Sequence, residues 1–315
     1  MKPLRIIFMG TPEFATATLA KILDEGHKVV AVITAPDRPA GRGRQLQESD
    51  VKKYAVSKGL TVLQPTNLKN EDFLSELKAL NANLQIVVAF RMLPKAVWAM
   101  PELGTFNLHA SLLPDYRGAA PINWAIINGE TETGATTFFI DDKIDTGEII
   151  LQEKTNIAEN DTAGTLHDRL MNLGADLVVK TVRQIEKGSV RTEKQKNTSS
   201  LKIANKIHRE TCEIDWSDSL EAIHNKIRGL TPYPTAWTTL VNGDKKIPLK
   251  IYDASKEKTT HHEQTGKVLV DSKVLKIAVK NGFIHLLEIQ LPGKRKMKTQ
   301  DLLNGFNFEE NAIVT

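Results

Sequence analysis

The stretch "RIIFMGTPEFATATLAKILDEG", residues 5–26, decides the fold of the first half of the chain. An apolar run ends at Gly10, and apolar residues then recur at helical spacing as far as Gly26. This order predicts a strand, a tight turn and a helix. The next stretch, "HKVVAVIT" at residues 27–34, has the composition of a second buried strand. A strand, a helix and a further buried strand in this order indicate a parallel sheet.

The same alternation continues along the first half of the chain. "LQIVVAF" (84–90) and "GTFNLHAS" (104–111) predict further strands, whereas residues 162–188 predict a long closing helix. "GATTFFID" and "GEIILQEKT" lie close together, so the sheet is expected to become partly antiparallel there. The sequence therefore predicts an α/β domain over residues 1–188, doubly wound and Rossmann-like with a mostly parallel sheet. It lacks the GxGxxG fingerprint and the P-loop of common nucleotide-binding folds.

The character of the sequence changes after this domain. Residues 189–206 are polar and weakly periodic, and we interpret them as a linker. Residues 207–315 contain short alternating segments, separated by turn signals such as Asn242-Gly243 and Asn281-Gly282. This pattern predicts a smaller C-terminal β-barrel, similar to the oligonucleotide-binding (OB-like) fold.

Composition limits the class of protein. The chain has 315 residues, of which 41% are hydrophobic, enough for one large or two medium domains. It has no apolar run of 18 residues and no signal-type cleavage site, so we expect a cytoplasmic protein without a membrane partner. The single cysteine, Cys212, excludes an internal disulfide and a cysteine zinc site. His261-His262 offers too few ligands, and no metal is expected.

Charge is distributed unevenly. Residues 242–300 contain 13 Lys or Arg and 6 Asp or Glu, so this segment carries +7, while the rest of the chain carries −3. A basic C-terminal part favours a polyanionic partner, and a solvated lysine-rich surface is the alternative. Trp216, Trp237 and Tyr233 are expected to pack inside the second domain rather than to stack on bases.

The least ordinary stretch is "FNLHASLLPDYRGAAPINWAI", residues 106–126. Asn107, His109 and Ser111 occupy alternate positions and should share one face near the carboxyl end of a strand. Ligands bind at that end in open parallel sheets. A carboxamide can donate a hydrogen bond to a developing oxyanion, and an imidazole can exchange a proton. The alternative for His109 is a core histidine that bonds to a backbone carbonyl.

A second polar turn follows in "DDKIDTGEII", residues 141–150, where Asp145 stands in the sequence "IDTGE". A loop aspartate is usually a turn former. If Asp145 approaches His109, it favours the imidazolium form of that ring.

These residues carry a family resemblance. "MGTPEFA" (9–15), "VVAFRMLP" (87–94), "HASLLPDYRGAAP" (109–121) and "IDTGEI" (144–149) resemble, in this order, the blocks of formyltransferases that use 10-formyltetrahydrofolate. "IDW…IRGLTPYPTAW" (214–237) extends the resemblance into the second domain. It implies an enzyme that passes the formyl group of 10-formyltetrahydrofolate to the α-amine of methionine on initiator tRNA.

The resemblance also implies roles for particular residues. The catalytic positions of the family fall on Asn107, His109 and Asp145, and its tRNA-contacting loop falls on residues 35–47, with Arg42 as the basic contact. A monomer is implied. The folate-contacting segment of the family falls on Ser111, Leu112, Leu113 and Pro114.

Two other functions stay open at this stage. One is a folate-dependent formyltransferase that acts on a small-molecule amine, such as a nucleotide sugar or glycinamide ribonucleotide, or that hydrolyses the donor. The other is an RNA-binding protein without catalysis. One departure from the family is Arg91, which stands where relatives often have glycine, beside the expected pterin pocket.

Overall fold

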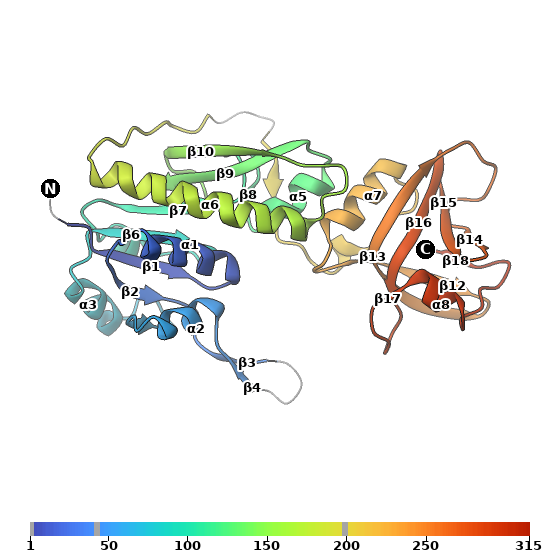
Figure 1. Ribbon diagram of the computed structural model, residues 1–315, viewed down its shortest axis with the longest axis horizontal. Coiled ribbons are helices and arrows are strands. Elements are labelled where there is room, and N and C mark those ends of the chain that lie inside the picture. Colours follow the sequence, from blue (N-terminus) through green and yellow to red (C-terminus); the bar gives the residue numbers. More distant parts are fainter. Residues whose placement is uncertain (1–2, 41–44, 197–200) are drawn as a thin grey trace. The chain divides into compact units, whose positions relative to one another are not determined.

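The computed structural model describes residues 3–40, 45–196 and 201–315 (Figure 1). The chain forms two compact units, and each is assembled from segments that are not contiguous in sequence. The N-terminal unit consists of Met1–Gly118, Thr133–Thr155 and His167–Ile203. The C-terminal unit consists of Ala119–Glu132, Asn156–Leu166 and Ala204–Thr315.

A seven-stranded sheet forms the centre of the N-terminal unit, in the order β10-β9-β7-β6-β1-β2-β5. The five strands from β7 to β5 are parallel, and β9 is antiparallel to β7. The predicted doubly wound α/β fold with a partly antiparallel edge is therefore confirmed. The strands are β1 (Ile6–Gly10), β2 (Val29–Ile33), β5 (Val62–Leu63), β6 (Leu84–Val88), β7 (Thr105–His109), β9 (Glu132–Phe139) and β10 (Ile149–Asn156).

Helices follow the strands as their apolar spacing predicts. The first helix buries Phe14, Leu19 and Ile22, which recur at helical spacing on one face. Side chains of Ser49 and Asn70 accept hydrogen bonds at the starts of two later helices. The helices of this region are α1 (Glu13–Asp24), α2 (Asp50–Ser57), α3 (Glu71–Ala79), α4 (Lys95–Trp98) and the long α6 (Ala163–Glu186).

Two short strands, β3 (Arg38–Ala40) and β4 (Gln45–Gln47), pair antiparallel within the predicted tRNA loop. Residues 41–44, and Arg42 with them, lie outside the described residues. The remaining short strands are β8 (Arg117–Gly118) and β11 (Ile203–Ala204).

The contacts on the two faces of the sheet show which face carries the polar side chains of strand β7. A Cβ atom on Gly174 of α6 would lie 2.8 Å from Leu108, so Leu108 faces α6. Asn107 lies beside Val87 of β6, which belongs to the apolar cluster that includes residues of α3 and α4. Because side chains alternate along a strand, Asn107 and His109 face the side opposite α6.

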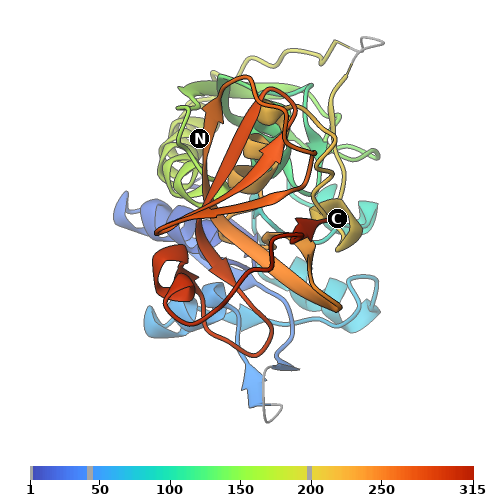
Figure 2. The ribbon, with the colours of Figure 1, turned by 90° about the vertical axis from the view of Figure 1, so that its right-hand side faces the viewer.

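The C-terminal unit contains an antiparallel sheet that curves around a common interior (Figure 2). Residue Lys267 forms a bridge with Ile313, which brings the two ends of the sheet together and nearly closes a barrel. The predicted β-barrel is therefore confirmed. Its strands are β12 (Ala236–Asn242), β13 (Lys245–Lys258), β14 (Val268–Asp271), β15 (Val274–Val279), β16 (Gly282–Gln290), β17 (Met297–Lys298) and β18 (Ile313–Val314). Its helices are α5 (Pro121–Ile127), α7 (Leu220–Gly229), α8 (Thr299–Leu303) and the 3-10 turn η1 (Glu210–Cys212).

The aromatic residues of this unit differ in environment. Trp216 is buried, and Trp237 packs partly buried against the core, as expected. Tyr233 is 82% exposed, so the expectation that it packs inside the domain is wrong. It stands between Pro232 and Pro234, whose rings restrict the backbone of the loop that carries it.

His224 makes the stability of the C-terminal unit sensitive to acid. It is buried on α7, and burial, with the charges of Lys256 and Arg228, lowers its pKa below the ordinary value. The unfolded chain therefore binds this proton more readily below about pH 6.5, and the free energy of unfolding falls as pH decreases from there. In urea unfolding at pH 7.5 and 5.5, we expect His224→Gln to lose less stability than the wild type. The exposed His262→Gln should behave like the wild type; equal pH dependence in all three proteins would contradict the assignment.

Candidate active site

His109 lies at the carboxyl end of β7 and is almost fully buried. Its Nε2 lies 2.8 Å from the carbonyl oxygen of Tyr116, and a carbonyl can only accept, so Nε2 carries a proton. The carbonyl contact expected of a core histidine is thus present. Its Nδ1 lies 3.8 Å from Oδ2 of Asp145, so a proton on Nδ1 completes an ion pair. The structure therefore brings together two of the three predicted catalytic side chains.

A tight turn positions Asp145, whose φ is +53°. The backbone N–H of Gly118 donates to Oδ2 at 2.9 Å. The Nε2 of Gln195 donates to the carbonyl oxygens of Asp145 and Gly147, at 2.9 and 2.8 Å. Arg117 in turn donates to Oε1 of Gln195. Residues from two separate segments, Arg117-Gly118 and Gln195, thus hold the aspartate beside the histidine.

Asn107 precedes His109 by two residues on β7, so both side chains extend from the same face of the sheet. Asn107 is partly exposed, and its carboxamide has no hydrogen-bond partner among the residues that the structure describes. This amide is therefore a free donor on the face that carries the His109–Asp145 pair.

The segment from Ser111 to Pro114 forms a turn beyond the end of β7. We expected Ser111 to continue the strand, but β7 ends at His109, and Ser111 is fully buried with its hydroxyl bonded to the carbonyl of Asp115. Leu113 is also buried, whereas Leu112 and Pro114 are partly exposed.

Thr136 of β9 holds this turn. Its hydroxyl donates to the carbonyl of Ser111 at 2.7 Å and accepts from the backbone N–H of Leu113 at 3.1 Å. The Nε2 of Gln152 donates to both the Thr136 hydroxyl and the Leu113 carbonyl, each at 2.9 Å. The shape of the turn therefore depends on two polar side chains from the antiparallel edge of the sheet.

Thr136→Val tests this support. The substitution keeps the shape but leaves the buried N–H of Leu113 without an acceptor, so the free energy of unfolding should fall by about 1–3 kcal/mol. The neighbouring Thr137 is equally buried on the opposite face, where its hydroxyl bonds to Thr181. Thr137→Val should also lower the free energy of unfolding, but it should leave the catalytic efficiency of formyl transfer unchanged. Thr136→Val should lower both quantities. Equal efficiency in both variants would refute a role for Thr136 in shaping the site.

Sequence reasoning missed Thr136, Gln152 and Gln195. Thr136 is a buried threonine on β9, a residue type that is common in strands, and Gln152 lies on β10, whose outward positions are polar. Gln195 stands in the segment that we interpreted as a linker. The only sequence signal for Thr136 and Gln152 was that both are polar residues on adjacent predicted strands, close to the Gly-containing turn at residues 141–150.

The described parts of the chain offer few competing sites. Among those residues, no group of three or more His, Cys, Asp or Glu side chains could hold a metal ion. No described helix is long and apolar enough to cross a membrane.

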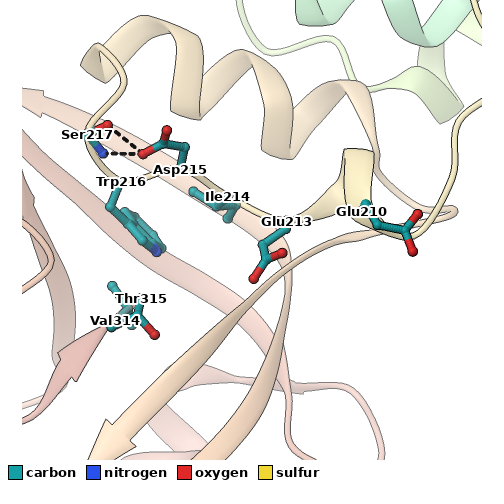
Figure 3. Close-up of a pocket in the computed structure, with 8 residues that line it drawn as sticks. All are labelled: Glu210, Glu213, Ile214, Asp215, Trp216, Ser217, Val314 and Thr315. Atoms are coloured by element: carbon teal, nitrogen blue, oxygen red, sulfur yellow. Dashed lines mark hydrogen bonds between the residues drawn. The ribbon is translucent and has the colours of Figure 1, made fainter.

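A depression of about 490 Å³ lies on the C-terminal unit, and Figure 3 shows its lining. Glu210, Glu213 and Asp215 contribute carboxylates to it, and hydrogen bonds from Ser217 lower the pKa of Asp215. This negative charge makes the depression unsuitable for a phosphate backbone.

Comparison with known families agrees with the fold. Residues 4–182 match the model of the formyl transferase family, and residues 206–307 match that of the formyl transferase C-terminal domain. The two matches together cover most of the chain, and they define a formyl transferase.

Relatives that match the full length of the chain show which formyl transferases it resembles. A methionyl-tRNA formyltransferase of Flavobacterium johnsoniae is 59% identical over 314 residues, covering 100% of each chain. One of Bacteroides fragilis is 51% identical over 312 residues, covering 98% of this chain and 96% of the relative. The chain therefore belongs to the methionyl-tRNA formyltransferase family, as the sequence blocks indicated.

Solved structures share the fold at low sequence identity. A sugar 3N-formyl transferase, solved with dTDP and 5-N-formyl-THF, has a TM-score of 0.65 at 21% identity, covering 94% of this chain and 100% of that protein. HypX from Aquifex aeolicus, in complex with tetrahydrofolic acid, has a TM-score of 0.65 at 16% identity, covering 96% of this chain and 47% of that protein. At these identities the likeness concerns the fold alone.

Proposed function

We propose that the chain transfers the formyl group of 10-formyltetrahydrofolate to the α-amino group of methionyl initiator tRNA, giving N-formylmethionyl-tRNA for translation initiation. The observation that carries this proposal is the identity of 51–59% to methionyl-tRNA formyltransferases along the whole chain. The pairing of His109 with Asp145, beside the free amide of Asn107, supplies chemistry suited to it.

The folate donor supplies an activated formyl carbon. Asn107 donates a hydrogen bond to the formyl oxygen as it becomes negative during attack by the amine, which stabilises the transition state. A free and partly exposed carboxamide is suited to this task because it loses no existing partner.

His109 moves the proton. Its Nε2 is committed to the carbonyl of Tyr116, so Nδ1 is the nitrogen that faces the reaction. The protonated ring donates to the developing oxyanion and, as the bond between the formyl carbon and N10 of the folate breaks, passes a proton, directly or through water, to N10. The attacking amine nitrogen loses one proton as the new amide forms, and this proton restores the protonated ring. Asp145 stabilises the charged ring across 3.8 Å. We assign these three residues the catalytic roles.

The four residues of the proposed folate-binding segment, Ser111 to Pro114, differ in how far their side chains are exposed. Leu112 and Pro114 are partly exposed, and we assign them side-chain contacts to the folate. Ser111 and Leu113 are buried, with backbone groups that already bond to Thr136, so they contribute by shaping the turn.

Arg42 and the basic C-terminal part are assigned to tRNA. If four phosphates are contacted, the affinity for initiator tRNA should fall about 100-fold between 50 and 200 mM salt. Arg42→Ala should reduce the slope of log Kd against log salt by about one. Binding titrations measure both, and an affinity that does not change with salt would rule out the electrostatic role.

A cytoplasmic location and a monomeric state complete the proposal. The family to which the chain belongs acts on a tRNA, which supports the location. Sedimentation of the purified protein with and without tRNA tests the monomer, because a dimer would double its mass.

One assay tests the function against its small-molecule alternative. The protein is incubated with 10-formyltetrahydrofolate and, in parallel, with methionyl initiator tRNA, an amino nucleotide sugar or glycinamide ribonucleotide. Formylation of the tRNA substrate, with much lower catalytic efficiency for the small amines, is expected. Preferential formylation of a small amine would overturn the assignment of substrate.

A further inference from the structure

Tyr233 is an aromatic side chain that the fold leaves outside every core. It is 82% exposed, whereas Trp216 in the same unit is 4% exposed and Phe283 is 6% exposed. Between residues 204 and 269 it is the only large apolar side chain that is exposed. It is therefore the most exposed large apolar side chain of this unit, since Val270, Val274 and Leu287, on strands β14, β15 and β16, are only 43–45% exposed.

The loop that carries Tyr233 is closed by hydrogen bonds at its base. The backbone N–H of Thr235 donates to the carbonyl of Leu230, and its hydroxyl donates to the carbonyl of Pro232, both at 2.9 Å. The hydroxyl of Thr231 donates to the carbonyl of Tyr252 at 2.7 Å. Pro232 and Pro234 restrict the backbone on either side of the ring.

The start of α6 supports the same loop. The backbone N–H of Gly164 donates to the carbonyl of Thr231 at 3.0 Å. A Cβ atom on Gly164 would lie 2.8 Å from Cδ of Pro232, so the two backbones are in close contact. The guanidinium of Arg228 donates to the carbonyl of Asp161 at 2.9 Å, which ties this segment to α7. The backbone on either side of the ring is therefore held in place, so the loop loses little conformational freedom on binding.

We infer that Tyr233 stacks on an unpaired base of the tRNA substrate. A rigid, exposed aromatic ring offers a flat surface for a base, and such stacking does not depend on sequence because every base has a π-face. The phosphate contacts of the basic barrel and the stacked base then act on one nucleic acid through two different forces. This inference rests on the proposed formylation of tRNA and extends it to a specific contact.

The test compares variants of the full chain. Tyr233→Ala should raise both the KM and the Kd for methionyl initiator tRNA by about 5- to 150-fold. The KM for the folate donor should stay the same. Tyr233→Phe and Tyr233→Trp should restore binding to within about threefold of the wild type, since stacking needs only the ring. Leu287→Ala, which removes an exposed apolar side chain from β16, serves as the control and should match the wild type.

Two further readouts separate stacking from other roles. The slope of log Kd against log salt should not change in Tyr233→Ala, because no phosphate contact is lost. An RNA duplex without unpaired bases should bind the wild type and Tyr233→Ala equally. In Tyr233→Trp, added tRNA should quench more tryptophan fluorescence than in the wild type.

The inference is overturned if Tyr233→Ala binds initiator tRNA as tightly as the wild type, or if the duplex loses as much affinity as the tRNA. It is also overturned if the added tryptophan is not quenched. If the wild type itself does not formylate methionyl initiator tRNA, the proposed function fails first, so the two failures are distinguishable.

Discussion

His109→Ala is expected to lower the turnover number of formyl transfer by at least about 100- to 1000-fold. Of the three side chains proposed for catalysis, the imidazole is the one that could both donate a hydrogen bond to the oxyanion and move a proton, and its Nδ1 lies 3.8 Å from Oδ2 of Asp145. Asn107→Ala should have an effect of the same order, because it removes the free amide donor. Steady-state kinetics with saturating donor and tRNA measure both losses.

Two further variants serve as controls for the predicted effect of His109→Ala. His262→Ala removes an exposed histidine of the C-terminal unit and should leave turnover unchanged. Asp145→Asn keeps an oxygen for the N–H of Gly118 but removes the charge, so it should slow turnover without loss of the turn. Near-normal turnover in His109→Ala or Asn107→Ala, with the fold intact, would refute the assigned role of that residue.

Gly147→Ala is expected to cause the second large loss. A Cβ atom on Gly147 would lie 1.6 Å from the carbonyl oxygen of Phe139, a distance that no side-chain rotation can relieve. The backbone must move, and the turn that holds Asp145 must move with it. We expect a destabilisation of about 1–3 kcal/mol and a loss of turnover similar to that of Asp145→Asn.

Gly305 provides a matched control for that substitution. A Cβ atom there would meet no heavy atom within 4 Å, so Gly305→Ala should retain wild-type turnover and stability. Thermal unfolding and kinetics of both variants give the comparison. Wild-type turnover in Gly147→Ala would show that the position of Asp145 does not depend on this backbone contact.

Local patterns in the sequence predicted the order of elements well. The apolar run before Gly10 and the helical spacing after it gave β1 and α1, and residues 162–188 gave the long helix α6. The barrel followed from alternating segments and Asn-Gly turns. These features depend on neighbouring residues, which is why periodicity alone could predict them.

Long-range contacts were harder to predict. The approach of Asp145 to His109 was stated only as a condition, because it depends on the pairing of β7 with β9 and on the turn after β9. Ser111 was wrongly placed on the strand, since nothing in the alternation marks His109 as its end. The prediction that Tyr233 is buried was wrong because it relied on the tendency of aromatic residues to pack in cores, and nothing in the local pattern shows which aromatic side chain projects from a loop.

The central claim is that the face of β7 bearing Asn107 and His109 passes a formyl group to the methionine amine of a charged tRNA. A single-turnover experiment with excess enzyme, labelled 10-formyltetrahydrofolate and methionyl initiator tRNA tests this most directly. In the wild type the label should appear on the methionine nitrogen, and in His109→Ala it should appear there at least about 100-fold more slowly. Release of the label as free formate, or equal rates in the two proteins, would contradict it.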